Sequence, residues 1–140
     1  MIFPVGYAPL SGTVADLDGD SVPDLVTANA TGDDVSVFLG NGDGSFQNAV
    51  AFATGDRPGS VAIADLDGDS LPDLITANRN GDNVSVLMGN GDGSFQAAVS
   101  FAAGVAPFSV AVADLDGDAV PDLVTAKNNS DGVKIGRAHV

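Results

Sequence analysis

The motif Asp-Leu-Asp-Gly-Asp-x-x-Pro-Asp occurs three times in this chain of 140 residues, at residues 16–24, 65–73 and 114–122. The copies are 49 residues apart, and when the sequence is shifted by that amount residues 3–51 match residues 52–100 at about 32 of 49 positions. A period of this size indicates one supersecondary unit per repeat, each packed against its neighbours. The chain is therefore expected to fold as a stack of similar units.

The second repeat has room for four strands. Strand-like runs are expected at residues 60–64, 73–78, 83–88 and 94–101. Asn-Gly and Asp-Gly pairs before the fourth run predict a hairpin, because these residues tolerate a positive φ. Four antiparallel strands in about 40–50 residues is the size of a β-propeller blade. We predict an all-β chain with about 2.7 blades, which is an incomplete propeller.

The repeat pattern ends within the third copy. The repeat region comprises residues 1–133, with repeats at 3–51, 52–100 and a truncated 101–133. Residues 134–140, Lys-Ile-Gly-Arg-Ala-His-Val, leave the pattern and resemble the translation of a common DNA sequencing adapter. We expect this tail to be non-native, which would give His139 no natural role and make the natural protein longer. A genuine divergent C-terminus is the alternative.

The charge of the chain restricts its partners. All 19 acidic residues are Asp, twelve of them lie in the three motifs, and the net charge is −14 with only five Lys and Arg. This balance argues against nucleic acid and against an anionic membrane surface as partners. No apolar run approaches about 20 residues, so membrane insertion is not expected. The N-terminus lacks the features of a signal peptide, so the chain is either not exported or a fragment of an exported protein.

The acidic motif has the composition of a calcium site. Carboxylates at its first, third, fifth and ninth places can converge on one hard cation, and Gly19 permits the tight backbone between them. Calcium accepts six to eight oxygens in flexible geometry, magnesium demands a strict octahedron, and zinc and copper favour His or Cys. An EF-hand needs Gly at place six and Glu at place twelve, where this chain has Ser21 and Thr27. A turn of solvated Asp residues is disfavoured, because these carboxylates repel one another without a cation.

The Asn-Gly-Asp-Gly segments are expected to be plain hairpins, with metal binding through Asp43 or Asp92 as the alternative. No catalytic constellation is visible, because the chain has neither Cys nor Glu. Ser36 and Ser85 fall in strand patterns and are expected to face outward. We therefore predict that the chain is not an enzyme.

The sequence resembles the VCBS and FG-GAP-like repeats. The similarity rests on Asp-Leu-Asp-Gly-Asp-Ser-Val-Pro-Asp-Leu followed by Leu-Gly-Asn-Gly-Asp-Gly-Ser-Phe, and it covers residues 3–133. The resemblance implies propeller blades like those of the integrin α-subunit head, with a calcium ion in the loop between the first two strands of each blade and up to three ions in the chain. The implied ligands are Asp16, Asp18, Asp20, the Val22 carbonyl and Asp24; Asp65, Asp67, Asp69, the Leu71 carbonyl and Asp73; and Asp114, Asp116, Asp118, the Val120 carbonyl and Asp122.

The resemblance also implies a function and a location. We expect a calcium-binding, non-catalytic segment of a secreted or cell-surface bacterial protein that serves adhesion or protein interaction. A carbohydrate-binding propeller, free-standing or attached to a secreted enzyme, is the alternative, although the chain has no Trp and one Tyr. The protein or glycan ligand is not identified. Family propellers close with about six to eight blades, so either further blades in a longer chain or self-assembly of copies is expected.

Overall fold

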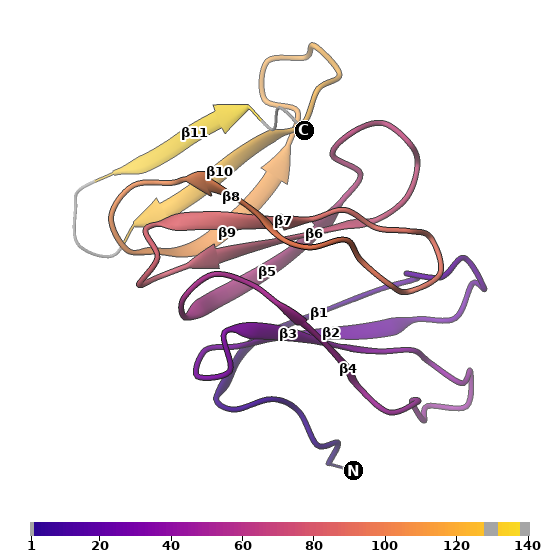
Figure 1. Ribbon diagram of the computed structural model, residues 1–140. Helices are drawn as coiled ribbons and strands as arrows, with labels where there is room; N and C mark the ends of the chain where they lie inside the picture. Colours follow the sequence, from indigo (N-terminus) through magenta and orange to yellow (C-terminus); the bar gives the residue numbers. More distant parts are fainter. Residues whose placement is uncertain (1, 128–131, 138–140) are drawn as a thin grey trace.

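The computed structural model describes residues 2–127 and 132–137. This part of the chain forms eleven β-strands and no helix, which confirms the all-β prediction (Figure 1). It accordingly holds no helix that could cross a bilayer. The strands are β1 (Pro9–Ala15), β2 (Asp24–Asn29), β3 (Asp34–Phe38), β4 (Val50–Ala53), β5 (Pro58–Ala64), β6 (Asp73–Asn78), β7 (Asn83–Leu87), β8 (Val99–Ala102), β9 (Pro107–Ala113), β10 (Asp122–Lys127) and β11 (Val133–Arg137).

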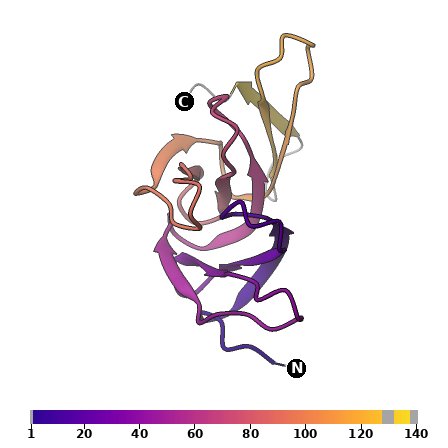
Figure 2. The ribbon, with the colours of Figure 1, turned by 90° about the vertical axis from the view of Figure 1, so that its right-hand side faces the viewer.

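Each repeat forms one antiparallel sheet in which strands adjacent in sequence are paired. The sheets have the orders β1-β2-β3-β4 and β5-β6-β7-β8 in the first two repeats, and β9-β10-β11 in the third. The four-stranded sheets are the expected blades. The three sheets fan out one after another without closing into a ring, as the two perpendicular views show (Figures 1 and 2).

The sheets stack mainly through their first and second strands. β1 packs on β5, and β5 packs on β9. Apolar side chains fill both junctions, and as a result every residue of β6 in the middle sheet is buried. The first junction contains Leu17, Val26, Val35, Val61 and Leu74, and the second contains Leu66, Ile75, Val84, Val110 and Leu123.

Ser36 and Ser85 are buried, so the prediction that they face outward is wrong. The Ser85 hydroxyl oxygen accepts hydrogen bonds from the Asn78 amide at 2.8 Å and from the Gly55 N–H at 3.0 Å. Ser36 accepts from the Asn29 amide at 2.8 Å in the same way. Because neighbouring segments cover both faces of these strands, an alternating polar residue does not reach water and is instead stabilised by hydrogen bonds.

The fourth strand of the second repeat is shorter than the expected run of residues 94–101. β8 begins only at Val99, and before it a single bridge joins Gly89 to Phe95. The pairing then shifts by one residue, because the next partners are Val86 and Val99. The extra residue on the second strand is a bulge-type irregularity that delays the regular ladder.

The third sheet includes part of the expected tail. β11 pairs along its length with β10, from Ala126 opposite Val133 to Asp122 opposite Arg137. The non-native origin of residues 134–140 stays a prediction, and His139 lies outside the described residues.

Candidate metal centre

The three acidic loops connect the first and second strands of each sheet. In every repeat the first Asp of the motif follows the end of a strand, and the ninth Asp is the first residue of the next strand: Asp24 begins β2, Asp73 begins β6 and Asp122 begins β10. The loops project from the same edge of the stack, on the right and top of Figure 1. The repeated fold therefore presents three equivalent acidic sites.

Three carboxylates converge in each loop. One oxygen from each of Asp16, Asp18 and Asp24 lies within 4.8 Å of the others, and the same holds for the equivalent Asp65, Asp67 and Asp73 and for Asp114, Asp116 and Asp122. Two oxygens on opposite sides of a calcium ion lie about 4.6–5.2 Å apart, and adjacent ones lie closer. An all-oxygen set at this spacing fits a hard cation such as calcium.

Backbone N–H groups hold these carboxylates in place. In the first loop, Gly19 and Ser21 donate to the two oxygens of Asp16 at 2.8 and 2.9 Å. Gly19 and Ser21 have φ values of 82° and 67°, which turn their N–H groups inward. The second and third loops repeat both hydrogen bonds at 2.8–3.0 Å. Because each carboxylate oxygen has two lone pairs, these bonds leave acceptor capacity for a metal ion.

The ninth Asp ties the loop to the sheet. Asp24 is fully buried, and its oxygens accept from the N–H groups of Leu17 at 2.7 Å and Gly40 at 2.8 Å. Asp73 repeats this arrangement with Leu66 and Gly89, both at 2.8 Å. This carboxylate thus fixes both the entry of the acidic loop and the chain just beyond the third strand.

Gly40 and Gly89 were missed by the sequence analysis, which assigned this segment only to a hairpin. A Cβ at Gly89 would lie 2.1 Å from the Pro72 carbonyl oxygen, and one at Gly40 would lie 2.3 Å from that of Pro23. Only glycine allows the close approach that brings the N–H to the carboxylate. The sequence did contain a signal for this role, because a glycine lies 16 residues after the ninth Asp in both of the first two repeats.

The fifth-place carboxylates have another contact. Asp20 accepts from the Val22 N–H at 2.8 Å, and Asp69 accepts from the Leu71 N–H at 2.9 Å. Asp118 accepts from Val120 in the same way. Places one, three and nine form the converging groups. Metal ligation by these carboxylates, by the fifth place and by the Val22, Leu71 and Val120 carbonyls stays a prediction.

The electrostatics of the loops reflect their crowding. The Asp20 N–H lowers the pKa of Asp18, but desolvation and repulsion from the Asp20 and Asp24 carboxylates raise it by more, so that the net shift is upward. Burial raises the pKa of Asp73, which the N–H groups of Gly89 and Leu66 only partly offset. A divalent cation would stabilise the ionised forms and relieve this repulsion.

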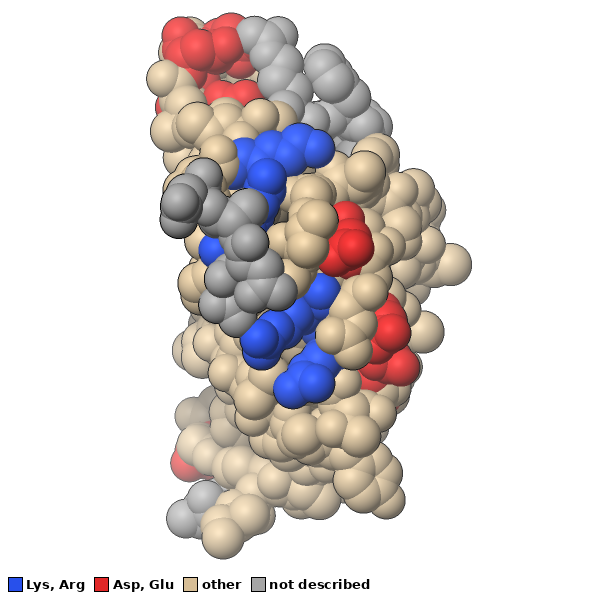
Figure 3. Space-filling view, turned by 90° about the vertical axis from the view of Figure 1, so that its left-hand side faces the viewer, with Lys and Arg blue, Asp and Glu red and all other residues tan. Residues whose placement is uncertain are grey.

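Three of the five basic residues lie at the strand ends away from the acidic loops, whereas Arg137 of β11 pairs with Asp122 at the third loop. Arg57 precedes β5, Arg79 follows β6 and Lys127 ends β10, and each of these places is at the strand end opposite the loop. Figure 3 shows the Lys and Arg side chains gathered on one face of the molecule. Arg57, Arg79 and Lys127 are therefore not placed to neutralise the loops.

The Asn-Gly-Asp-Gly segments have hairpin geometry. Asp92 accepts from both the hydroxyl and the N–H of Ser94, and the Asn90 N–H donates to the Ser94 carbonyl at 3.0 Å. These two bonds to Ser94, first from the hydroxyl and then from the N–H, lower the pKa of Asp92. Asp43 and Ser45 repeat the arrangement in the first repeat.

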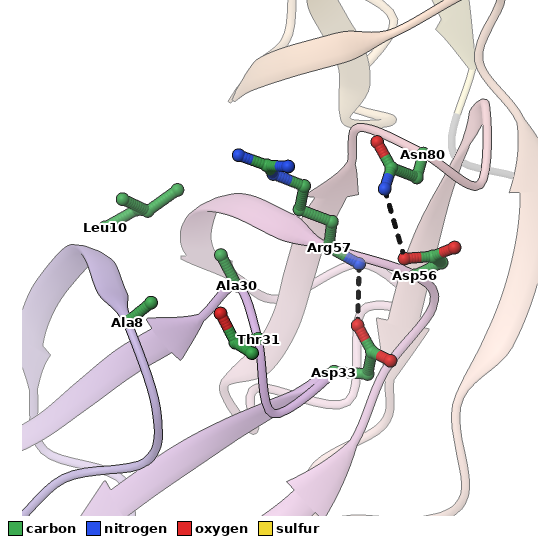
Figure 4. Close-up of a pocket in the computed structure, with 8 residues that line it drawn as sticks. All are labelled: Ala8, Leu10, Ala30, Thr31, Asp33, Asp56, Arg57 and Asn80. Carbon is green, nitrogen blue, oxygen red and sulfur yellow. Dashed lines mark hydrogen bonds between the residues drawn. The ribbon is translucent and has the colours of Figure 1, made fainter.

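A pocket of about 320 Å³ lies between the first two repeats, at the strand ends opposite the acidic loops (Figure 4). The Arg57 N–H donates to Asp33 across the junction at 2.8 Å, and within the second repeat the Asn80 amide contacts Asp56 at 3.5 Å. The Ala106 N–H donates to Asp82 at 2.8 Å at the next junction. The recurring bond identifies this region as a contact between repeats.

Comparison with known proteins supports the same architecture. No curated protein matches the sequence. Among solved structures, the Photorhabdus luminescens Tc holotoxin pore has a TM-score of 0.59 and 22% identity over 96% of this chain and 7% of that chain. A TcdB2-TccC3 structure has a TM-score of 0.59 and 21% identity over 95% of this chain and 7% of the other. A structure of BBS1N in complex with ARL6DN has a TM-score of 0.55 and 18% identity, over 86% of this chain and 37% of that chain.

These structural similarities show the fold alone, and the chain spans a small part of each of these proteins. The sequence profile of the FG-GAP-like repeat matches residues 16–76 and 65–125, which together cover most of the chain. Both matches begin at the first Asp of an acidic motif and extend into the second strand of the next repeat. The chain therefore belongs to the FG-GAP-like repeat family.

Proposed function

We propose that this chain is a calcium-binding, non-catalytic repeat segment in which each acidic loop holds one calcium ion. The observation that carries the proposal is the convergence of three carboxylates at the same places in all three repeats. In the first repeat Asp16, Asp18 and Asp24 would hold the ion, with Asp20 and the Val22 carbonyl as further oxygen donors. The ion would supply structural stabilisation and no chemical step.

Stabilisation follows from linkage between binding and folding. The ligands of one ion come from the end of one strand, from the loop and from the start of the next strand, so they converge only in the folded sheet. An ion present at 100 times its Kd stabilises the folded state by about 2.7 kcal/mol per site. The ion would also stabilise the chain beyond the third strand, because the ninth Asp accepts a hydrogen bond from Gly40 in the first repeat and from Gly89 in the second.

A role in adhesion or protein interaction, in a secreted or cell-surface protein, is part of the proposal. Extracellular modules bind calcium with Kd values of about 10⁻⁴–10⁻³ M, which millimolar calcium saturates. A measured Kd in that range would support a location outside the cell. A Kd below about 10⁻⁷ M would remove this support, because such sites would fill in either compartment.

The carbohydrate-binding alternative has less support. The strongly exposed aromatic side chains among the described residues are Tyr7, Phe101 and Phe108. They occupy three different places in the repeat, so they do not form a repeated stacking platform for sugar rings.

Asp67→Asn tests the proposed calcium sites, with Asp92→Asn as its matched control. Both changes remove one charge from an exposed loop and keep an oxygen that can accept the local N–H bond. In saturating calcium, Asp67→Asn should cost about 1–3 kcal/mol and lower the Tm by several degrees, and in chelator it should cost little. Asp92→Asn should change the response to calcium hardly at all. Equal losses for Asp67→Asn in calcium and in chelator, measured by thermal unfolding, would show that no ion is held there.

A further inference from the structure

The same leucine of the acidic motif is buried in two repeats and exposed in the third. Leu17 and Leu66 are 1% and 3% exposed, whereas Leu115 is 54% exposed. Leu17 belongs to a core cluster with Val61 and Leu74 of the second repeat, and Leu66 belongs to one with Val110 and Leu123 of the third. Each of the first two leucines is therefore covered by the repeat that follows it.

The third strand of each sheet shows the same contrast in exposure. Val35 and Val84 are 0% and 3% exposed, and the equivalent Val133 in β11 is 60% exposed. We call Leu115 and Val133 the rear face of the third repeat. It has the same residues at the same places as two surfaces that are packed against another repeat within this chain.

Hydrogen bonds across the two junctions follow the same rule. The Val61 N–H donates to the Ser11 hydroxyl oxygen at 3.4 Å, and the Val110 N–H donates to that of Ser60 at 3.0 Å. Ser109 is the equivalent acceptor in the third repeat, and Gly12 has the place of the donor in the first. The chain thus has the acceptor for such a junction, Ser109, in its last repeat and the donor, Gly12, in its first repeat.

The N-terminal segment has the place of an outer strand of a preceding repeat. Phe52 in β4 of the first sheet packs edge-on against Phe95, which follows β7 of the second sheet, with ring centroids 5.4 Å apart. Phe3, 49 residues earlier, packs edge-on against Phe46 of the first repeat at 5.1 Å. Within the described residues the third sheet ends at β11, where the other two sheets have a fourth strand. Because Val35 pairs with Phe52, the equivalent partner of Val133 is Phe3.

We propose that the rear face of the third repeat binds the first repeat of a second copy of this chain, head to tail. In this contact Leu115 is covered as Leu17 and Leu66 are, and the Gly12 N–H donates to Ser109. The segment around Phe3 pairs with the open edge of β11 as a fourth strand. The occupant is a second copy because both halves of the junction already exist on this chain and match the two junctions formed within it. A contact of this heterologous type leads to rings or to open chains of copies.

Association is tested with the 140-residue chain and single substitutions. Sedimentation velocity from about 1 to 300 µM should show mass increasing with concentration for the unmodified chain. Leu115→Asp and Val133→Asp should each weaken association at least tenfold without changing the far-UV circular dichroism, because both side chains are exposed. Val99→Asp is the matched control, since Val99 is 55% exposed but lies on β8 of the middle repeat, and it should associate normally. A monomer throughout this range, or equal association of Leu115→Asp and Val99→Asp, would overturn the proposal.

The orientation is tested by disulfide formation, because the chain has no cysteine of its own. A Cβ at Gly12 meets its nearest atom at 3.4 Å, so Gly12→Cys is sterically tolerated. A mixture of Gly12→Cys chains and Ser109→Cys chains should form disulfide-linked pairs of one chain of each kind under mild oxidation. Ser109→Cys chains alone should not. Equal cross-linking of Ser109→Cys alone would indicate face-to-face contact and contradict the head-to-tail arrangement.

Discussion

The acidic loop and the hairpin turn of the second repeat are both short, exposed and rich in Asp and Gly, yet they are different kinds of site. In residues 65–73 three carboxylates converge, and burial raises the pKa of Asp73. In the turn, Asp92 is satisfied by the hydroxyl and N–H of Ser94, and its pKa is lowered. The comparison shows that convergence of several carboxylates, rather than Asp-Gly composition, makes a candidate metal centre. Isolated Asp residues cap turns.

Asp73→Ala should have the largest effect on stability. It removes the acceptor of two buried N–H groups, those of Leu66 and Gly89, and each unsatisfied group costs about 1–3 kcal/mol. We expect a loss of about 2–5 kcal/mol in urea unfolding, with or without calcium, and a further loss of the calcium response. Asp92→Ala is the comparison and should cost far less. A similar cost for the two changes would mean that the acidic loop is no more integrated into the sheet than the turn is.

Gly89→Ala should come next. The added Cβ would lie 2.1 Å from the Pro72 carbonyl oxygen, so the junction between the acidic loop and the turn must move. We expect a loss of about 1–3 kcal/mol, measured by urea unfolding.

Gly68→Ala is the control for this change. Gly68 lies within the acidic loop with a φ of 83° and has nothing within 4 Å of an added Cβ, so its cost is limited to about 1–2 kcal/mol of backbone strain. Gly68 also donates to a converging carboxylate, that of Asp65 at 2.8 Å, but its added Cβ meets no atom, so Gly89→Ala should reduce the calcium response more than Gly68→Ala does. An unchanged calcium response in Gly89→Ala would show that the Gly89 N–H does not contribute to calcium binding.

Asp92→Asn should have the smallest effect, and the effect should depend on pH. A carboxylate with a lowered pKa contributes stability above its unfolded pKa, near 3.8, and loses it as the pH falls through its folded pKa. The unmodified chain should therefore exceed the variant in Tm at pH 6, and the difference should be lost as the pH falls through the folded pKa of Asp92, which lies below 3.8. A difference that grows on acidification would contradict the hydrogen-bonding of Asp92 to Ser94.

The sequence predicted the architecture well because the period and the acidic motif are local, repeated features. The four-stranded sheets and the position of the acidic loops between first and second strands follow directly from them. The burial of Ser36 and Ser85 could not be predicted from alternation, because stacking covers both faces of a sheet. The role of Gly89 was missed because its partner Asp73 lies 16 residues away and is reached only through the fold.

The arrangement of the candidate metal site could also be predicted only in part from the sequence. Spacing alone did not distinguish the fifth-place carboxylates from the first-, third- and ninth-place carboxylates that converge. The different exposures of Leu66 and Leu115 are likewise invisible in two nearly identical motifs. They depend on whether another repeat packs against the sheet.

Native mass spectrometry of the folded chain in calcium and after chelation tests the central claim most directly. Three calcium ions per chain, lost on chelation together with a fall in Tm, is the predicted result. Chains that are folded in millimolar calcium and carry no ion would contradict the proposal that the acidic loops are calcium sites.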